Sequence, residues 1–372
     1  MRIAILSSFY PLRGGIAQFS AAMLEELGKS HSVKAFTYSR QYPSILFPGT
    51  SQYVGPDDEA VKVDAEPVVD TLNPFSWRRT ARKIKAWQPD VVILRYWMSW
   101  FAPALGVIAR HCGCQKVIAL IDNALPHERH FFDIPLAKWF FEACSGYITM
   151  SPSVSAELQG MVPDARFDEI PHPLYTHFGN RIPKEEAEDS LGLAHGPRNL
   201  LFFGLIRDYK GLDVLLEAFR SLDERYRLII AGEPYGSFDK YEALIKTIPG
   251  RDRIVLHTDY IKDSDVKKFF SAADLVVLPY KSATQSGIAA ISYHFDIPLV
   301  TTLTGSIGCA VQEAGTGIAV PPCDPAAVAG AIERYFNEEG IADSCRAAIA
   351  AEKERLSWKN FCNALVDFAE SI

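Results

Sequence analysis

Two basic residues follow a strand-like run in the second half of the chain. In "LLFFGLIRDYKGLDVLLEAF", Gly204 ends the predicted strand, and Arg207 and Lys210 lie in the turn before a helix that begins near Gly211. An arginine fork beside a lysine point charge suits a diphosphate. The alternative is that both are solvated surface cations, because most Arg and Lys side chains are exposed.

A second turn is polar but carries no acid. The stretch "ATQSGI" holds Thr284, Gln285, Ser286, Gly287 and Ile288. If a helix begins near Ser286, its free N–H groups and its dipole attract an anion, and Gly287 allows close backbone approach. Ser286 as a simple helix N-cap is the alternative, and the sequence does not separate the two.

A glycine pair follows the first predicted strand. In "YPLRGGIAQF", Gly14 and Gly15 form a turn before a helical pattern, where N–H groups can hold an anion or a sugar hydroxyl. A plain strand-to-helix turn is the alternative. The spacing is not GxGxxG, and no acid ends the next strand "HSVKAFTYS", which disfavours a nicotinamide site.

The elements that must position these turns alternate along the chain. Strand-like runs such as "RIAILSS", "DVVILRYW" and "KVIALID" are each followed by longer amphipathic or polar segments, a pattern typical of βαβ units and parallel sheets. A proline- and charge-rich break at 171–197 precedes a restart of the pattern. We predict an α/β chain of two Rossmann-like doubly wound domains facing a cleft, residues 1–175 and 176–356. The C-terminal helix, 357–372, can pack on either domain.

Composition agrees with a two-domain cytoplasmic protein. The chain has 372 residues, 48% of them hydrophobic and 22% charged, which is too long for one typical core. An odd number of scattered cysteines suits reduced thiols, and Cys112 and Cys114 lack a second pair at metal spacing, so we expect no metal site. The net charge of −7 argues against nucleic acid as a partner.

These motifs, in this order, resemble the retaining GT-B glycosyltransferases of family 4. The resemblance rests on "YPLRGGIAQF", "FFGLIRDYKGLDVLLEAF", "IIAGE", "HTDYIKDSDVKKFFSAADLVVLPYKSATQSGI" and "GTGIAVPPCDPAAVAGAI", and it spans nearly the whole chain. It implies a UDP- or GDP-linked sugar as donor substrate, bound mainly by the second domain, with no separate cofactor. The acceptor would bind mainly to the first domain.

The resemblance also assigns residues to roles. It implies that Arg207 and Lys210 bind the diphosphate, that the backbone near Tyr260 and Ile261 receives the nucleobase, and that the turn of Gly14 and Gly15 closes over the donor. In "LIDNALPHERHFFD", His127 is our choice for the histidine that contacts the donor sugar in this family, although Asp122 lies closer to the strand. A hydrogen-bonded surface histidine is the alternative.

The implied reaction is hexosyl transfer with retention and without a metal. In this family the leaving diphosphate itself is expected to help deprotonate the acceptor, so no glycosidase-like carboxylate pair is needed. The resemblance implies that Arg207, Lys210 and helix N-termini neutralise the leaving charge in place of a metal.

One family feature is missing. The usual paired glutamates, which contact the sugar and the ribose, would fall at about Ala283 and Ile291, and neither side chain accepts a hydrogen bond. Sugar recognition would then fall to Thr284, Gln285, Ser286 and the backbone.

The predicted function is sugar transfer to a glycan, lipid-linked or small-molecule acceptor in surface polysaccharide or glycoconjugate synthesis. A nucleotide-sugar epimerase and a non-catalytic nucleotide- or glycan-binding relative are the alternatives.

The aromatics in "LRYWMSWFAPALG" either touch a sugar or lipid-linked acceptor or pack beneath the next helix. We therefore expect a cytoplasmic protein, with peripheral contact at the inner membrane face as an option, although no polybasic helix is evident.

Overall fold

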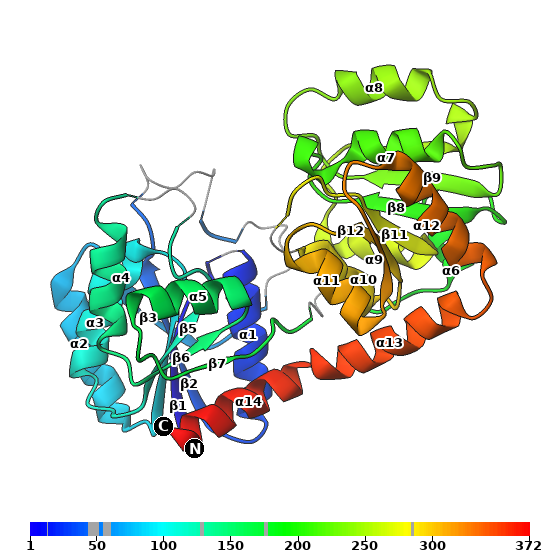
Figure 1. Cartoon of the computed structure of the whole chain (residues 1–372). Coiled ribbons are helices and arrows are strands. Elements are labelled where there is room, and N and C mark those ends of the chain that lie inside the picture. The colour runs from blue at the N-terminus through cyan, green and yellow to red at the C-terminus, as the bar shows by residue number, and fades with distance from the viewer. Residues whose placement is uncertain (13, 44–51, 55–60, 127–129, 175–177, 284–285) are drawn as a thin grey trace. The chain divides into compact units, whose positions relative to one another are not determined.

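The computed structural model describes residues 1–12, 14–43, 52–54, 61–126, 130–174, 178–283 and 286–372. By internal contacts the chain divides into two compact units, which are described separately (Figure 1). Unit 1 comprises Met1–Pro173 and Leu356–Ile372, and unit 2 comprises Leu174–Arg355. The sequence-based boundaries were placed after residues 175 and 356.

Unit 1 is built on a parallel sheet in the order β3-β2-β1-β4-β5-β6-β7. Its strands are β1 (Arg2–Leu6), β2 (Ser32–Arg40), β3 (Ala65–Asp70), β4 (Val91–Tyr96), β5 (Val117–Ile121), β6 (Gly146–Thr149) and β7 (Phe167–Glu169). Its helices are α1 (Gly15–Gly28), α2 (Pro74–Trp87), α3 (Ala102–His111), α4 (Asp133–Phe141), α5 (Pro152–Met161) and α14 (Trp358–Ser371), with a short 3₁₀ turn, η2 (Ser99–Phe101).

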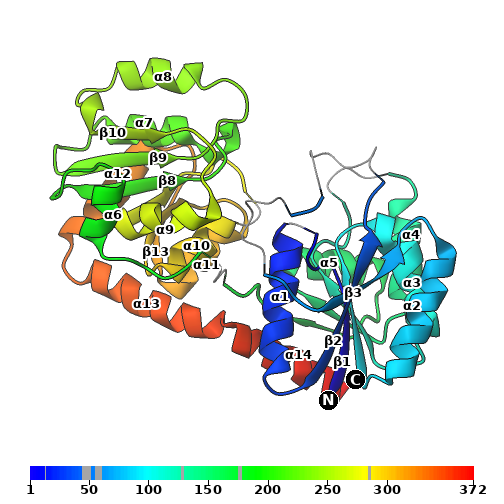
Figure 2. The ribbon, with the colours of Figure 1, turned by 180° about the vertical axis from the view of Figure 1, so that it is seen from behind.

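The strands of unit 1 send alternate side chains to two cores, as a pleated strand must. Ala4 and Leu6 of β1 belong to the core under α2, α3, α4 and α5, whereas Ile3 and Ile5 belong to the core under α1 and α14. The C-terminal helix α14 buries Phe361 and Leu365 in that second core, and both views show it beside α1 (Figures 1 and 2).

Unit 2 repeats the architecture with a parallel sheet in the order β10-β9-β8-β11-β12-β13. Its strands are β8 (Arg198–Phe203), β9 (Tyr226–Ala231), β10 (Ile254–His257), β11 (Leu275–Leu278), β12 (Leu299–Thr302) and β13 (Gly317–Val320). Its helices are α6 (Lys184–Ser190), α7 (Leu212–Phe219), α8 (Asp239–Lys246), α9 (Asp263–Ala272), α10 (Gly287–His294), α11 (Gly305–Ala314), α12 (Pro325–Asn337) and α13 (Ile341–Arg355), with 3₁₀ turns η3 (Asp208–Lys210) and η4 (Arg251–Arg253).

The predicted pair of parallel, Rossmann-like α/β sheets is confirmed. In both sheets the strand order reverses beside the first strand, between β1 and β4 in unit 1 and between β8 and β11 in unit 2. Ligands of open α/β sheets bind outside the carboxyl ends of the strands at such a switch point. The turns after β1, β4, β8 and β11 are therefore where a ligand site is expected.

Candidate functional site

Gly204 lies at the switch point of unit 2, directly after β8. Its φ of +94° is in the region that favours glycine, and its N–H donates to the carbonyl of Ala231 at 2.9 Å. A Cβ added at Gly204 would lie 2.9 Å from Nζ of Lys210 and 3.2 Å from Cδ1 of Ile288. Three predicted site residues, Gly204, Lys210 and Ile288, are therefore brought together from the β8 turn, η3 and α10.

The amine of Lys210 is held in this group as a buried cation. The residue is only 8% exposed, and burial, with the nearby positive charge of Arg207 as the second cause, lowers the pKa of Lys210 to about 8. The solvated-cation alternative is therefore wrong for Lys210. Arg207 is exposed, and its guanidinium lies over the ring of Tyr235 at 4.0 Å from the centroid.

The turn that carries Lys210 is braced from two sides. A Cβ added at Gly211, whose φ is +71°, would lie 2.0 Å from the carbonyl oxygen of Pro279, so the turn packs directly on the chain after β11. Lys281 in that chain donates its N–H to the carbonyl of Tyr209 at 2.7 Å, and its amine bonds Asp213 at 2.8 Å. These contacts fix the turn that carries Lys210 relative to the segment directly after β11.

The start of α10 matches the predicted helix boundary. Ser286 occupies the N-cap position, but its hydroxyl makes no capping hydrogen bond and instead pairs with the hydroxyl of Tyr280 at 3.0 Å. Burial raises the pKa of Tyr280 to about 12, so that phenol stays protonated. Gly287 is the exposed first residue of the helix, while Thr284 and Gln285 lie outside the described residues.

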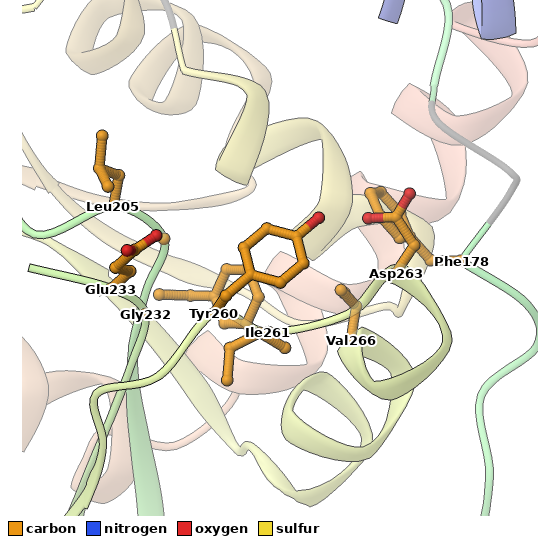
Figure 3. A pocket seen from close by; sticks show the side chains of 10 residues that line it. Phe178, Leu205, Gly232, Glu233, Tyr260, Ile261, Asp263 and Val266 are labelled. Atoms are coloured by element: carbon orange, nitrogen blue, oxygen red, sulfur yellow. The ribbon is translucent and has the colours of Figure 1, made fainter. Parts of the chain in front are cut away.

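Gly204 also borders a pocket of about 270 Å³. Figure 3 shows the Tyr260 ring at its centre, with Leu205 and Glu233 to one side and Phe178 and Asp263 to the other. The ring is 71% exposed. The pocket is lined by Phe178, Phe203, Gly204, Leu205, Gly232, Glu233, Tyr260, Ile261, Asp263 and Val266.

This pocket has the composition of a site for a planar ring with a polar edge. Aromatic and aliphatic side chains supply stacking surface, and two carboxylates supply acceptors for hydroxyl or N–H donors. Tyr260 and Ile261, predicted to receive a nucleobase, both line it. Because Gly204 borders both the pocket and Lys210, the predicted base and diphosphate positions adjoin.

Unit 1 places Gly14 and Gly15 after β1, at its own switch point. Gly14 is the N-cap of α1, both glycines are exposed, and a Cβ added at either would meet nothing within 4 Å. Open space therefore lies above this turn, as a ligand-facing loop requires. His127 lies outside the described residues.

An ion pair that was not foreseen from the sequence packs against α1, the helix that follows the glycine turn. Arg95 of β4 is 1% exposed and donates to both oxygens of Asp122, at 2.8 and 2.6 Å. Its guanidinium also lies 3.9 Å from the ring centroid of Phe19 in α1. The ring of His172 packs edge-on against Phe19, and burial lowers the pKa of His172. An arginine inside the apolar run "VVILRY" was the available signal, since such a charge needs a partner.

The aromatic residues after β4 turn out to be packing residues. Trp97 is 8% exposed, Phe101 is fully buried, and the indole of Trp97 donates to the hydroxyl of Tyr42 at 2.9 Å. Of the two alternatives left open by the sequence, packing beneath the next helix is therefore confirmed for these two side chains. They form part of the core under α3.

Two kinds of feature are absent from the described residues. No group of three or more His, Cys, Asp or Glu side chains there is arranged to hold a metal ion. Within the same residues, none of the helices combines the length and apolar character of a transmembrane span.

Solved structures share this two-sheet arrangement over the whole chain. Anabaena HepE, solved in complex with UDP, matches with a TM-score of 0.72 and 14% identity, covering 100% of both chains. Sucrose-phosphate synthase from Thermosynechococcus elongatus matches with a TM-score of 0.67 and 17% identity, covering 100% of this chain and 98% of that one. The chain has the GT-B fold.

The sequence similarity of this GT-B chain to known proteins is concentrated in part of its length. Residues 197–338 match the family model "Glycosyl transferases group 1". A GDP-mannose:glycolipid 4-beta-D-mannosyltransferase from Xanthomonas campestris is 35% identical over 204 residues, 54% of each chain. A D-inositol 3-phosphate glycosyltransferase from Xylanimonas cellulosilytica is 27% identical over 182 residues, 48% of this chain and 43% of that one. The chain thus spans about half the length of the relatives it matches.

Proposed function

We propose that this chain is a glycosyltransferase that moves a hexose from a UDP- or GDP-linked donor to a glycan, lipid-linked or small-molecule acceptor. The observation that carries the proposal is the position of Gly204, which borders both the Tyr260 pocket and the buried amine of Lys210. A nucleoside diphosphate has the matching two parts, a planar base and a charged diphosphate. The match of residues 197–338 to glycosyltransferases supports this assignment.

In the proposed complex the base and ribose occupy the Tyr260 pocket, and the diphosphate approaches Lys210 and the N-terminus of α10. Glu233 and Asp263 offer acceptors to the ribose hydroxyls or to the base edge. Ile291, at one position of the missing glutamates, is a buried core residue, so this part of α10 contributes no ribose contact. Pocket carboxylates would take over that contact.

For the chemical step, we propose that stabilisation of the leaving diphosphate is the main contribution of unit 2. A protonated Lys210 in a water-poor position acts on developing negative charge more strongly than a solvated cation does. Arg207 and the N-terminus of α10 add positive potential. Transfer with retention and without a metal remains part of the proposal, with an oxygen of the leaving diphosphate accepting the acceptor's proton.

Roles in surface polysaccharide or glycoconjugate synthesis fit the names of the relatives, which include a glycolipid mannosyltransferase. That mannosyltransferase is named for GDP-mannose, whereas HepE was solved with UDP. The test should therefore include both GDP-linked and UDP-linked donors. We propose a cytoplasmic location with peripheral membrane contact, on a surface other than Trp97 and Phe101.

The test is to incubate the chain with a panel of UDP- and GDP-sugars, with magnesium or with EDTA, and to measure release of nucleoside diphosphate. We expect slow release from one donor, equal under both conditions and lost in Lys210→Ala. Once an acceptor is found, NMR of the anomeric proton in the product tests retention. Interconversion of two free nucleotide sugars would identify an epimerase instead. Binding of a nucleotide with no turnover of any donor would support the non-catalytic alternative.

A further inference from the structure

The outer surface of α2, α3 and α4 in unit 1 combines exposed apolar and cationic side chains. These helices lie side by side on the same face of the sheet, with α3 between the other two (Figures 1 and 2). The core beneath them is closed by their inward residues, so the outer side chains are not needed to fill it.

The apolar part of this surface is unusually exposed for large side chains. Phe131 is 94% exposed and Phe75 is 85% exposed, and four more large apolar residues on the same helices or just before them are at least one third exposed. Large apolar side chains exposed on neighbouring helices in this number are unusual for a surface that contacts only water. The set is Leu72, Phe75, Phe131, Phe132, Ile134 and Trp139.

Within α2, α3 and α4, the exposed Asp, Glu, Lys and Arg side chains are all basic. Helix α2 carries five cations and no acid, namely Arg78, Arg79, Arg82, Lys83 and Lys85. All but Lys83 are exposed, and Lys83 pairs with Glu66. The expectation that the chain has no evident polybasic helix is therefore wrong, because α2 is one.

The neighbouring helices keep this sign. Arg110 of α3 lies 4.1 Å from the ring centroid of Trp139, which joins a cation to the apolar set. The acid of α4, Asp133, is buried and bonded to Ser99. Among the described residues, the nearest exposed acid along the chain is Glu142, just past the end of the helix. This local positive charge occurs on a chain whose net charge is −7.

We propose that this surface binds the face of a bilayer that contains anionic lipids. Aromatic rings prefer the boundary between headgroups and acyl chains, and basic residues on a helix are attracted by lipid phosphates. Cations spread along α2 from Arg78 to Lys85 match a continuous negative surface better than a discrete protein epitope. Phe75 and Phe131 lie at the N-terminal ends of α2 and α4, at the carboxyl edge of the unit 1 sheet, where Gly14 also lies.

That placement would bring the predicted acceptor side close to the lipid headgroups. This consequence rests on the proposed function, but bilayer binding itself does not require sugar transfer. The surface of α2, α3 and α4 would also make the membrane contact without Trp97 and Phe101, the aromatic residues after β4.

The test is co-flotation of the full chain with vesicles of phosphatidylcholine alone or mixed with phosphatidylglycerol, at low and high salt and without donor. We expect binding only to the anionic vesicles, weakened by salt. The double charge reversal Arg78→Glu with Arg79→Glu should weaken vesicle affinity on the order of tenfold or more. Phe75→Ser with Phe131→Ser should weaken it on the order of tenfold while leaving its salt dependence in place.

Two control variants change the same chemistry elsewhere. Lys359→Glu reverses an exposed charge on α14, and Leu256→Ser removes an exposed apolar residue on β10. Both should bind vesicles as the unaltered chain does, and thermal melting checks that every variant is folded.

Equal binding to both kinds of vesicle, or unchanged binding by both double variants, would overturn the proposal. A concentration-dependent dimer that the same variants disrupt, seen by light scattering, would assign the surface to a second copy of the chain. Because no donor is used, a negative result here leaves the proposed sugar transfer untouched.

Discussion

Replacing Lys210 with methionine is expected to stabilise the free protein and to weaken its binding of a nucleoside diphosphate. Methionine keeps an unbranched side chain of similar length but removes the buried amine. In the folded chain that amine is 8% exposed, and its pKa is lowered to about 8 from 10.5, with burial as the main cause. The residue therefore disfavours folding whenever it must carry its proton.

The size of this effect follows from linkage. A difference between 10.5 and about 8 corresponds to about 3 kcal/mol, because one pKa unit is equivalent to about 1.4 kcal/mol. At pH 7 both folded and unfolded chains hold the proton, so the full cost is present there. The cost shrinks as pH rises above about 8 and is gone above 10.5, where the unfolded chain has also lost the proton.

Thermal and chemical unfolding at neutral and alkaline pH measure the first half of the prediction. Lys210→Met should unfold at a higher temperature at pH 7, by roughly 2–4 °C for each kcal/mol gained. The difference should disappear above pH 10.5. Lys246→Met, which changes a lysine whose side chain is 66% exposed, should leave stability unchanged at both pH values.

Calorimetric titration measures the second half. Loss of a charge-assisted hydrogen bond costs about 1.5–3 kcal/mol, so affinity for a nucleoside diphosphate should fall about 10- to 150-fold in Lys210→Met. A variant that is less stable than the unaltered chain at pH 7 would refute the argument from burial. A variant that keeps its affinity would refute the role of Lys210 at the diphosphate.

Three further predictions concern pH, the ion pair of unit 1 and the pocket. Affinity for a nucleoside diphosphate should be full below pH 8 and fall as pH rises above it, since Lys210 loses its proton there. Calorimetry of Lys210→Arg should show no such fall. A flat pH profile in the unaltered chain would contradict the role of Lys210 at the diphosphate. Asp122→Ala leaves the buried guanidinium of Arg95 unpaired and should lower the free energy of unfolding by about 3 kcal/mol in denaturant titrations, with part of the loss recovered when Arg95→Met is added. Tyr260→Ala should weaken binding of nucleoside diphosphates by about 5- to 150-fold, through lost stacking, while pyrophosphate binding stays the same; equal losses for both ligands would place the base elsewhere.

The fold was predictable where strands are buried on both faces. Strands β1, β4, β5 and β8 are apolar runs bounded by polar or glycine-rich turns, and each was anticipated. The sequence analysis did not name β3 and β7, because both lie at sheet edges, where β3 contains Pro67 and β7 is the short polar run "FDE". Helix α6 lies within the segment interpreted as an interdomain connection.

The candidate site was predictable only as far as residues close in sequence are concerned. The turn from Gly204 to Lys210 was visible as a motif, and the structure adds that Lys210 is buried while Arg207 is exposed. That difference depends on Gly211 packing against Pro279, a contact between distant segments. The pocket partners Phe178 and Glu233 come from yet other elements, and no local pattern links them to Tyr260.

The central claim is that unit 2 holds a nucleoside diphosphate with its base in the Tyr260 pocket and its phosphates at Lys210. The most direct measurement is calorimetric titration of the full chain with UDP and with GDP in the presence of EDTA. We predict that one of them binds at a single site, and that Lys210→Ala and Tyr260→Ala each weaken this binding at least about fivefold. If neither nucleotide binds, or if both variants bind as tightly as the unaltered chain, the account is contradicted.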